Sequence, residues 1–140
     1  MRKTARKLAA VTGGLVMAAG GITANTAVAA QAPPSASGVQ ADCYGGSVAY
    51  SKPDGNFYYP TSSTARLTTS SNCTDINVRP ATNRYIKVCF YPSSGGSYCQ
   101  ADYTYARSGQ WNVIATDVGD GTKYRLLFNI SGAATGRVAD

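Results

Sequence analysis

Few side chains in this sequence could carry out acid–base or nucleophilic chemistry. The chain has no His and no Glu, which excludes Ser-His-Asp and Cys-His arrangements. The closest carboxylate pair is Asp117 and Asp120, in the run TDVGDGT. Asp and Gly favour tight hairpin turns, and a calcium loop would need more oxygen ligands at alternating positions. We therefore expect a non-enzymatic protein with no cofactor and no bound metal.

Four cysteines are the other reactive groups. Four cysteines in a small exported chain indicate two disulfides, and three pairings are possible. We favour Cys89–Cys99, because closing the shortest loop costs the least chain entropy, which leaves Cys43–Cys73. Zinc spacings such as Cys-x-x-Cys do not occur. Oxidised cysteines provide no thiolate nucleophile.

Binding through aromatic side chains is the remaining possibility. The stretch Arg84–Tyr105 contains two strand-like arms, each with one cysteine, on either side of a Pro-Ser-Ser-Gly-Gly turn. Strand side chains alternate between faces, so Ile86, Val88 and Phe90 are expected to point into the core. The tyrosines of both arms then share the outer face. The candidate ligand-binding residues are Tyr85, Tyr91, Tyr103, Tyr105 and Trp111.

A structural explanation of these aromatic residues stays open. Tyrosine is a good strand residue whose hydroxyl can meet water, and Trp111, at the start of a strand, fits a core position as well as a rim position. The partner arm also fits imperfectly. Pairing Cys89 with Cys99 would place Gln100 and Asp102 opposite core residues, which predicts either a bulge or an edge with a polar face.

The N-terminus has the features of an export signal. Residues 1–30 begin with four basic side chains, continue with an apolar run and end in small residues, which is typical of a cleaved secretory signal. The glycines and threonines in that run make a poor membrane span. We expect residues 31–42, which are polar and rich in proline, to be a disordered tail. Residues 43–140 then form a single extracellular domain, without stable membrane insertion.

The net charge of +6 comes largely from this signal, which holds four of the 13 Lys and Arg. The nine that remain are dispersed and face seven Asp, so the rest of the chain is nearly neutral. A nucleic-acid binder would show a clustered basic face. We therefore expect no nucleic-acid partner.

Turn residues divide the domain into short strand-like runs. This pattern predicts an all-β fold, a small antiparallel β-sandwich or barrel-like domain with two disulfides. We expect Gly119–Gly121 to join two consecutive strands as a hairpin. The expected strands lie at Tyr44–Tyr50, Asn56–Tyr59, Arg66–Thr69, Asp75–Arg79, Tyr85–Tyr91, Tyr98–Tyr105, Trp111–Asp117, Lys123–Ile130 and Gly136–Ala139.

Three parts of the sequence carry a resemblance: the signal, the cysteine spacing, and the stretches Asp75–Phe90 and Trp111–Phe128. They resemble uncharacterised small secreted proteins of actinobacteria. The resemblance implies no activity and no site residue. Secreted protease and amylase inhibitors of such bacteria are similar in size and disulfide number, which is a likeness of architecture alone.

These observations predict a secreted, monomeric, non-catalytic binding protein. Its first expected ligand is polysaccharide or cell-wall glycan, bound by the aromatic sheet face on a rigid support. The alternative is a proteinaceous inhibitor of a secreted hydrolase, a protease or an amylase, which would present the loop Tyr91–Tyr98 or a protruding Arg66 to the enzyme.

Overall fold

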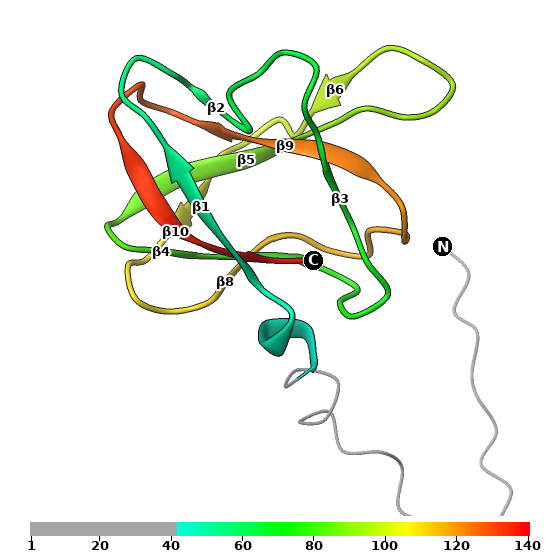
Figure 1. Ribbon diagram of the computed structural model, residues 1–140, viewed down its shortest axis with the longest axis horizontal. Helices are drawn as coiled ribbons and strands as arrows, with labels where there is room; N and C mark the ends of the chain where they lie inside the picture. The colour runs from blue at the N-terminus through cyan, green and yellow to red at the C-terminus, as the bar shows by residue number, and fades with distance from the viewer. Residues whose placement is uncertain (1–41) are drawn as a thin grey trace, which may run out of the picture. The chain divides into compact units, whose positions relative to one another are not determined.

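Short runs of alternating apolar and polar residues become ten β-strands in the computed structural model, which describes residues 42–140 (Figure 1). The expected signal and most of the expected tail lie outside these residues. One helical turn at 42–45 precedes the strands. The strands are β1 (Val48–Lys52), β2 (Tyr58–Tyr59), β3 (Leu67–Thr68), β4 (Ile76–Pro80), β5 (Arg84–Phe90), β6 (Tyr98–Cys99), β7 (Thr104–Ala106), β8 (Asn112–Ala115), β9 (Lys123–Phe128) and β10 (Ala134–Ala139).

The strands form two antiparallel sheets, so the predicted fold class is confirmed as a β-sandwich. The four-stranded sheet has the order β1-β10-β4-β8. The six-stranded sheet has the order β2-β9-β5-β6, with β3 also paired to β9 and β7 also paired to β5. Figure 1 shows β1 and β10 running across the direction of β5 and β9. Both predicted disulfides, Cys43–Cys73 and Cys89–Cys99, are present.

The core lies between the two sheets. On β5, Ile86 and Val88 are fully buried, as the alternation predicted, and they pair with Phe128 and Leu126 of β9. The four-stranded sheet supplies the facing apolar side chains. They are Tyr50, Ile76, Val78, Ile114, Ala115, Ala134 and Val138.

Two local predictions are wrong. The strand expected to begin at Tyr44 begins at Val48, because the backbone N–H of Gly46 donates to the carbonyl of Asp42 and closes a helical turn. Gly119–Gly121 does not form a hairpin between β8 and β9. These strands belong to different sheets, so this turn carries the chain from one layer to the other. Turn residues specify a local bend and leave the pairing of the flanking strands undetermined.

The second arm of the hairpin is interrupted by a bulge between β6 and β7. Cys99 pairs with Cys89, but Thr104 pairs with Ile86, so residues 100–103 hold two more residues than regular pairing needs. The side chain of Gln100 fills the break. Its Oε1 accepts from the N–H of Val88 at 2.8 Å, and its Nε2 donates to the carbonyl of Ile114 at 2.9 Å. Gln100 thus links the two sheets, and the arm is bulged.

β10 reaches the middle of its sheet because of one small residue. Gly136 lies opposite Tyr50 on one side and Pro80 on the other. A Cβ at this position would lie 2.5 Å from the carbonyl oxygen of Arg79 and 2.8 Å from the Tyr50 ring. Only glycine allows this close approach of three strands.

Lys52, at the end of β1, is a fully buried cation. Its Nζ donates to the carbonyls of Asn56, Ser131 and Gly132 at 2.5 to 3.1 Å. All three donors of the ammonium group therefore have acceptors, which offsets the cost of removing a charge from water. Burial lowers the pKa of Lys52, and the nearby Arg84 lowers it further. Lys52 fastens the loop after β1 to the loop after β9.

Candidate functional site

The outer side of the six-stranded sheet presents an exposed aromatic group. Tyr85 of β5 pairs directly with Tyr105 of β7. Tyr103 precedes Tyr105 by two residues, so its side chain lies on the same side. Their exposed fractions are 47%, 44% and 37%. Lys87 of β5 lies on the same side, since its neighbours Ile86 and Val88 face the core. We call Tyr85, Lys87, Tyr103 and Tyr105 the tyrosine face.

The rings of this face do not form a flat platform. Tyr85 and Tyr105 have ring centroids 4.9 Å apart and ring planes inclined by 46°. Lys87 Nζ lies 4.6 Å from the centroid of the Tyr103 ring, a distance at which a cation is attracted to an aromatic ring. The face therefore offers an angled aromatic pair beside a cation held by a third ring.

The neighbouring part of the outer side is covered by the chain between β2 and β3. The guanidinium of Arg125 in β9 donates to the carbonyls of Pro60 and Thr61 and lies 4.3 Å from the Tyr58 ring. Arg125 is buried there, although its strand position points outward. Its role in holding this loop is structural.

Tyr91 is under the same loop. The guanidinium of Arg66 lies 3.6 Å from the Tyr91 ring centroid and donates to the carbonyls of Ser63 and Ala65 at 2.7 Å. Tyr91 is half-buried by this contact. Arg66, expected as a protruding anchor, is half-buried too, because its guanidinium is stacked on a ring and hydrogen-bonded.

A groove lies next to Tyr91, at the end of the sandwich where the β5–β6 loop meets the start of β9. Its volume is about 330 Å³. Its walls are formed by the aromatic rings of Phe90, Tyr91 and Tyr98, together with the side-chain hydroxyls of Ser93 and Thr122 and the amine of Lys123. The backbone N–H of Tyr91 donates to the carbonyl of Lys123 at 2.9 Å, which fixes two walls relative to each other.

The loop Tyr91–Tyr98 is closed at its base by the Cys89–Cys99 disulfide. Its tip contains Gly95 and Gly96, both at positive φ (95° and 78°), which only glycine adopts readily. The tip therefore carries no large side chain that could fill an enzyme pocket. The prominent side chain is Tyr98 at the base, with 61% of its surface exposed.

Trp111 does not join the tyrosine face. It stacks on Tyr44 with ring centroids 4.5 Å apart and planes within 3°, and packs against the cluster of Cys43, Cys73 and Ala139. Of the five predicted aromatic residues, the structure thus brings together Tyr85, Tyr103 and Tyr105. Tyr91 is nearby under Arg66, and Trp111 supports the other disulfide.

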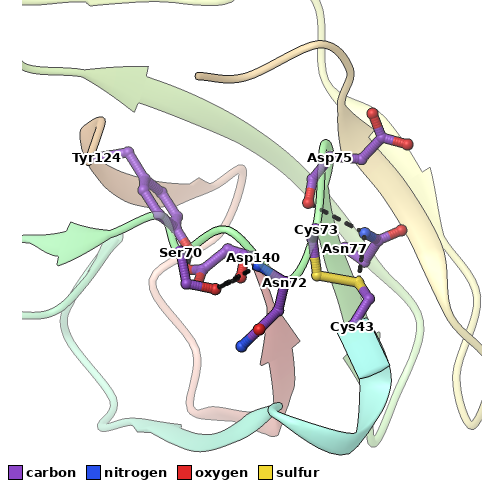
Figure 2. The surroundings of a disulfide bond; sticks show 8 residues. All are labelled: Cys43, Ser70, Asn72, Cys73, Asp75, Asn77, Tyr124 and Asp140. Carbon is purple, nitrogen blue, oxygen red and sulfur yellow. Dashed lines mark hydrogen bonds between the residues drawn. A yellow bond between two sulfur atoms is a disulfide. The ribbon is translucent and has the colours of Figure 1, made fainter. Parts of the chain in front are cut away.

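The surroundings of Cys43–Cys73 are packed and acidic (Figure 2). The hydroxyl of Tyr124 donates to the carboxylate of Asp140, and the hydroxyl of Ser70 donates to its carbonyl. Burial raises the pKa of Asp140, and the hydrogen bond from Tyr124 opposes part of that rise. Burial and the adjacent Asp140 raise the pKa of Tyr124. Tyr124 is fully buried and Asp140 is half-buried.

The sequence reasoning missed three members of the candidate site: Lys87, Tyr98 and Lys123. Tyr98 could have been found from the disulfide alone, because pairing Cys89 with Cys99 places Phe90 opposite Tyr98. Lys123 could not, because its proximity to Tyr91 depends on which strand lies beside β5. The described residues contain no group of three or more Cys, Asp, Glu or His that could bind a metal ion, and no helix within 42–140 is long and apolar enough to cross a membrane.

Comparisons with protein-family models, with curated proteins and with solved structures find no match. The functional argument therefore depends on the geometry of this chain.

Proposed function

We propose that this protein is a secreted, monomeric, non-catalytic binding protein that recognises extracellular polysaccharide, such as cell-wall glycan, through the tyrosine face. Two disulfides are typical of proteins that work outside the cell, and the sequence of residues 1–30 has the features of an export signal. Both observations support the extracellular location.

One observation carries the choice of ligand: three exposed tyrosines and a half-buried lysine lie side by side on a rigid sheet. A tyrosine ring has a broad apolar surface and a polar hydroxyl at its edge. Sugars have the matching combination of C–H faces and hydroxyl groups. The inclination of 46° between Tyr85 and Tyr105 suits a polymer whose successive units are twisted relative to each other.

The support beneath the face is firm. The Tyr85–Tyr105 pair belongs to the β5–β7 ladder, β5 is also paired with β9 along most of its length, and the Cys89–Cys99 disulfide closes the adjacent hairpin. A binding surface that is already ordered loses little entropy when ligand binds.

The proposal is tested by retention of the protein on insoluble chitin, cellulose and peptidoglycan. We expect the wild type to be retained and a Tyr85→Ala/Tyr105→Ala variant to lose at least about tenfold in affinity, because each lost aromatic contact costs about 1 kcal/mol. Phe57→Ala is the matched control, since Phe57 is an aromatic side chain 48% exposed elsewhere.

Equal retention of the wild type and the folded double variant would exclude the tyrosine face as the binding surface. Inhibition of a secreted protease or amylase by the wild type, without retention on any glycan, would favour the inhibitor alternative through the loop Tyr91–Tyr98. Thermal unfolding of each variant establishes that the fold is intact.

A further inference from the structure

The charged side chains of the six-stranded sheet are of one sign. Its strands contain basic residues and no aspartate, and the same is true of the four-stranded sheet. The outer side carries Lys87, Lys123 and Arg125, and Arg66 joins them from the covering loop. Arg66 and Arg125 are occupied by backbone carbonyls. Lys87 and Lys123 are therefore the cations best placed to meet a ligand.

Four of the seven aspartates gather at a different place, whereas Asp102 and Asp120 lie close in sequence to Tyr103 and Lys123. Asp75 accepts from the backbone N–H of Asp117 at 3.1 Å, Asp140 is beside Ser70, and Asp42 is adjacent to Cys43. These four lie around the Cys43–Cys73 disulfide. Figure 1 shows the helical turn at 42–45 at the end of the domain away from β6. The groove itself is locally positive, because its lining contains Lys123 and no carboxylate, and a local positive charge attracts anions.

The groove has the chemistry of a site for one charged sugar unit. Lys123 is exposed at its wall, and the lining residues include no carboxylate. Asp120, three residues earlier, is exposed and outside the lining. The rings of Tyr91 and Tyr98 offer apolar walls, and the hydroxyl of Ser93 offers a hydrogen bond. The Thr122 hydroxyl donates to the carbonyl of Gly119 at 2.6 Å, so toward a ligand it can act as an acceptor. A volume of about 330 Å³ is at the small end of ligand sites.

We infer that the glycan is acidic, and that the groove binds one of its anionic units with Lys123 as the partner of the negative charge. This inference rests on the proposed function and adds the class of polymer to it. The shared ligand chemistry is a sugar or polyol chain carrying carboxylate or phosphodiester groups. Lys87 on the tyrosine face is placed to meet a further charge along the same chain.

The experiment compares an acidic polymer with its uncharged ester, and with a second anionic polymer of a different backbone. Binding of polygalacturonate, of its methyl ester and of poly(glycerol phosphate) is measured in solution by affinity electrophoresis or calorimetry. We expect polygalacturonate to bind at least about tenfold more tightly than its ester, which corresponds to about 1.4 kcal/mol. We expect this preference to shrink when salt rises from about 20 to 300 mM, since exposed charges are screened. The polymer that binds more tightly, polygalacturonate or poly(glycerol phosphate), shows whether the preferred anion is a carboxylate or a phosphodiester.

Substitutions then assign the groove. Lys123→Met should lower the affinity for polygalacturonate to that for the ester. Lys123→Arg should retain most of the preference for the acidic polymer. Arg79→Met is the matched control, because it removes the same charge from an exposed position on the other sheet. A preference that persists in Lys123→Met but disappears in Lys87→Met would overturn the assignment to the groove.

The two proposals fail differently. If the ester binds as tightly as the acid, the polymer is not recognised by its charge, and the tyrosine face remains a glycan site. If no neutral or acidic polymer binds to the folded protein, the proposed function itself is overturned.

Discussion

Two disulfides of the same kind hold two very different ends of this domain. Around Cys43–Cys73, which we call the closed end, both cysteines are buried, Tyr44 stacks on Trp111, and Asp140 is fixed by Ser70 and Tyr124. Around Cys89–Cys99, which we call the open end, Cys99 and Tyr98 are exposed beside a groove. One bridge therefore completes the core, while the other holds an exposed surface in place.

Removing each disulfide should separate these roles and should give the largest effects. The Cys43→Ala/Cys73→Ala variant opens a loop with a sequence separation of 30, and Cys89→Ala/Cys99→Ala opens one of 10. Loop entropy predicts losses in unfolding free energy of about 4 and about 3 kcal/mol. Urea unfolding measures both.

Glycan retention, measured on the same two variants at a temperature where each is folded, should show the opposite order. We expect the closed-end variant to bind as the wild type does and the open-end variant to bind weakly, because the loop 91–98 loses its covalent base. Equal loss of binding in both variants would contradict the division of roles.

A matched removal of one hydroxyl at each end gives the next largest difference. Tyr124→Phe removes the buried donor to the half-buried Asp140 carboxylate, and we expect a loss of about 2 kcal/mol in unfolding free energy. Tyr98→Phe removes a hydroxyl from an exposed ring at the open end, and we expect a change within about 0.5 kcal/mol. Similar losses in the two variants would show that the closed end is no more tightly organised than the open one.

The smallest expected effect is a pH-dependent contribution of Asp140, at the closed end, to the unfolding free energy. The folded state raises the pKa of Asp140 above its ordinary value of 3.8, because burial disfavours the charged form. The stability that comes from this preference is fully present below pH 3.8 and is lost as the pH rises through the higher folded-state pKa.

Urea unfolding between about pH 3 and pH 6 should therefore show this decline, and Asp140→Asn should reduce it. Asp102→Asn, an exposed aspartate close to Cys99 in the sequence, is the control. If the unfolding free energy still declines in Asp140→Asn but no longer declines in Asp102→Asn, the titrating group lies at the open end instead.

The sequence predicted the fold class and the Cys89–Cys99 bridge because these depend on local information: the alternation in β5, the turn residues and a cysteine separation of 10. Cys43–Cys73, with a separation of 30, followed because only these two cysteines were left. The outward direction of Tyr85 and Tyr105 followed from the same alternation. The division into two sheets did not, because Gly119–Gly121 has the same residues whether it joins paired strands or crosses between layers.

The rest of the candidate site depends on contacts between distant segments. Arg66 and Tyr91 meet because the chain between β2 and β3 folds over the sheet. Lys123 reaches the groove because β9 is the neighbour of β5. The bulge at Gln100 depends on an acceptor in the opposite sheet. No periodicity within one segment contains this information.

The central place of β10 has a consequence for the order of events during synthesis. β10 lies between β1 and β4, so the four-stranded sheet has a gap in its middle until nearly the whole chain has emerged. Domains are made from the N-terminus onward, and pairing between distant strands is slow. β1 and β4 have no common partner before β10 is made, so the four-stranded sheet is completed by one of the last segments to be synthesised. The position of one strand therefore sets when this sheet can form.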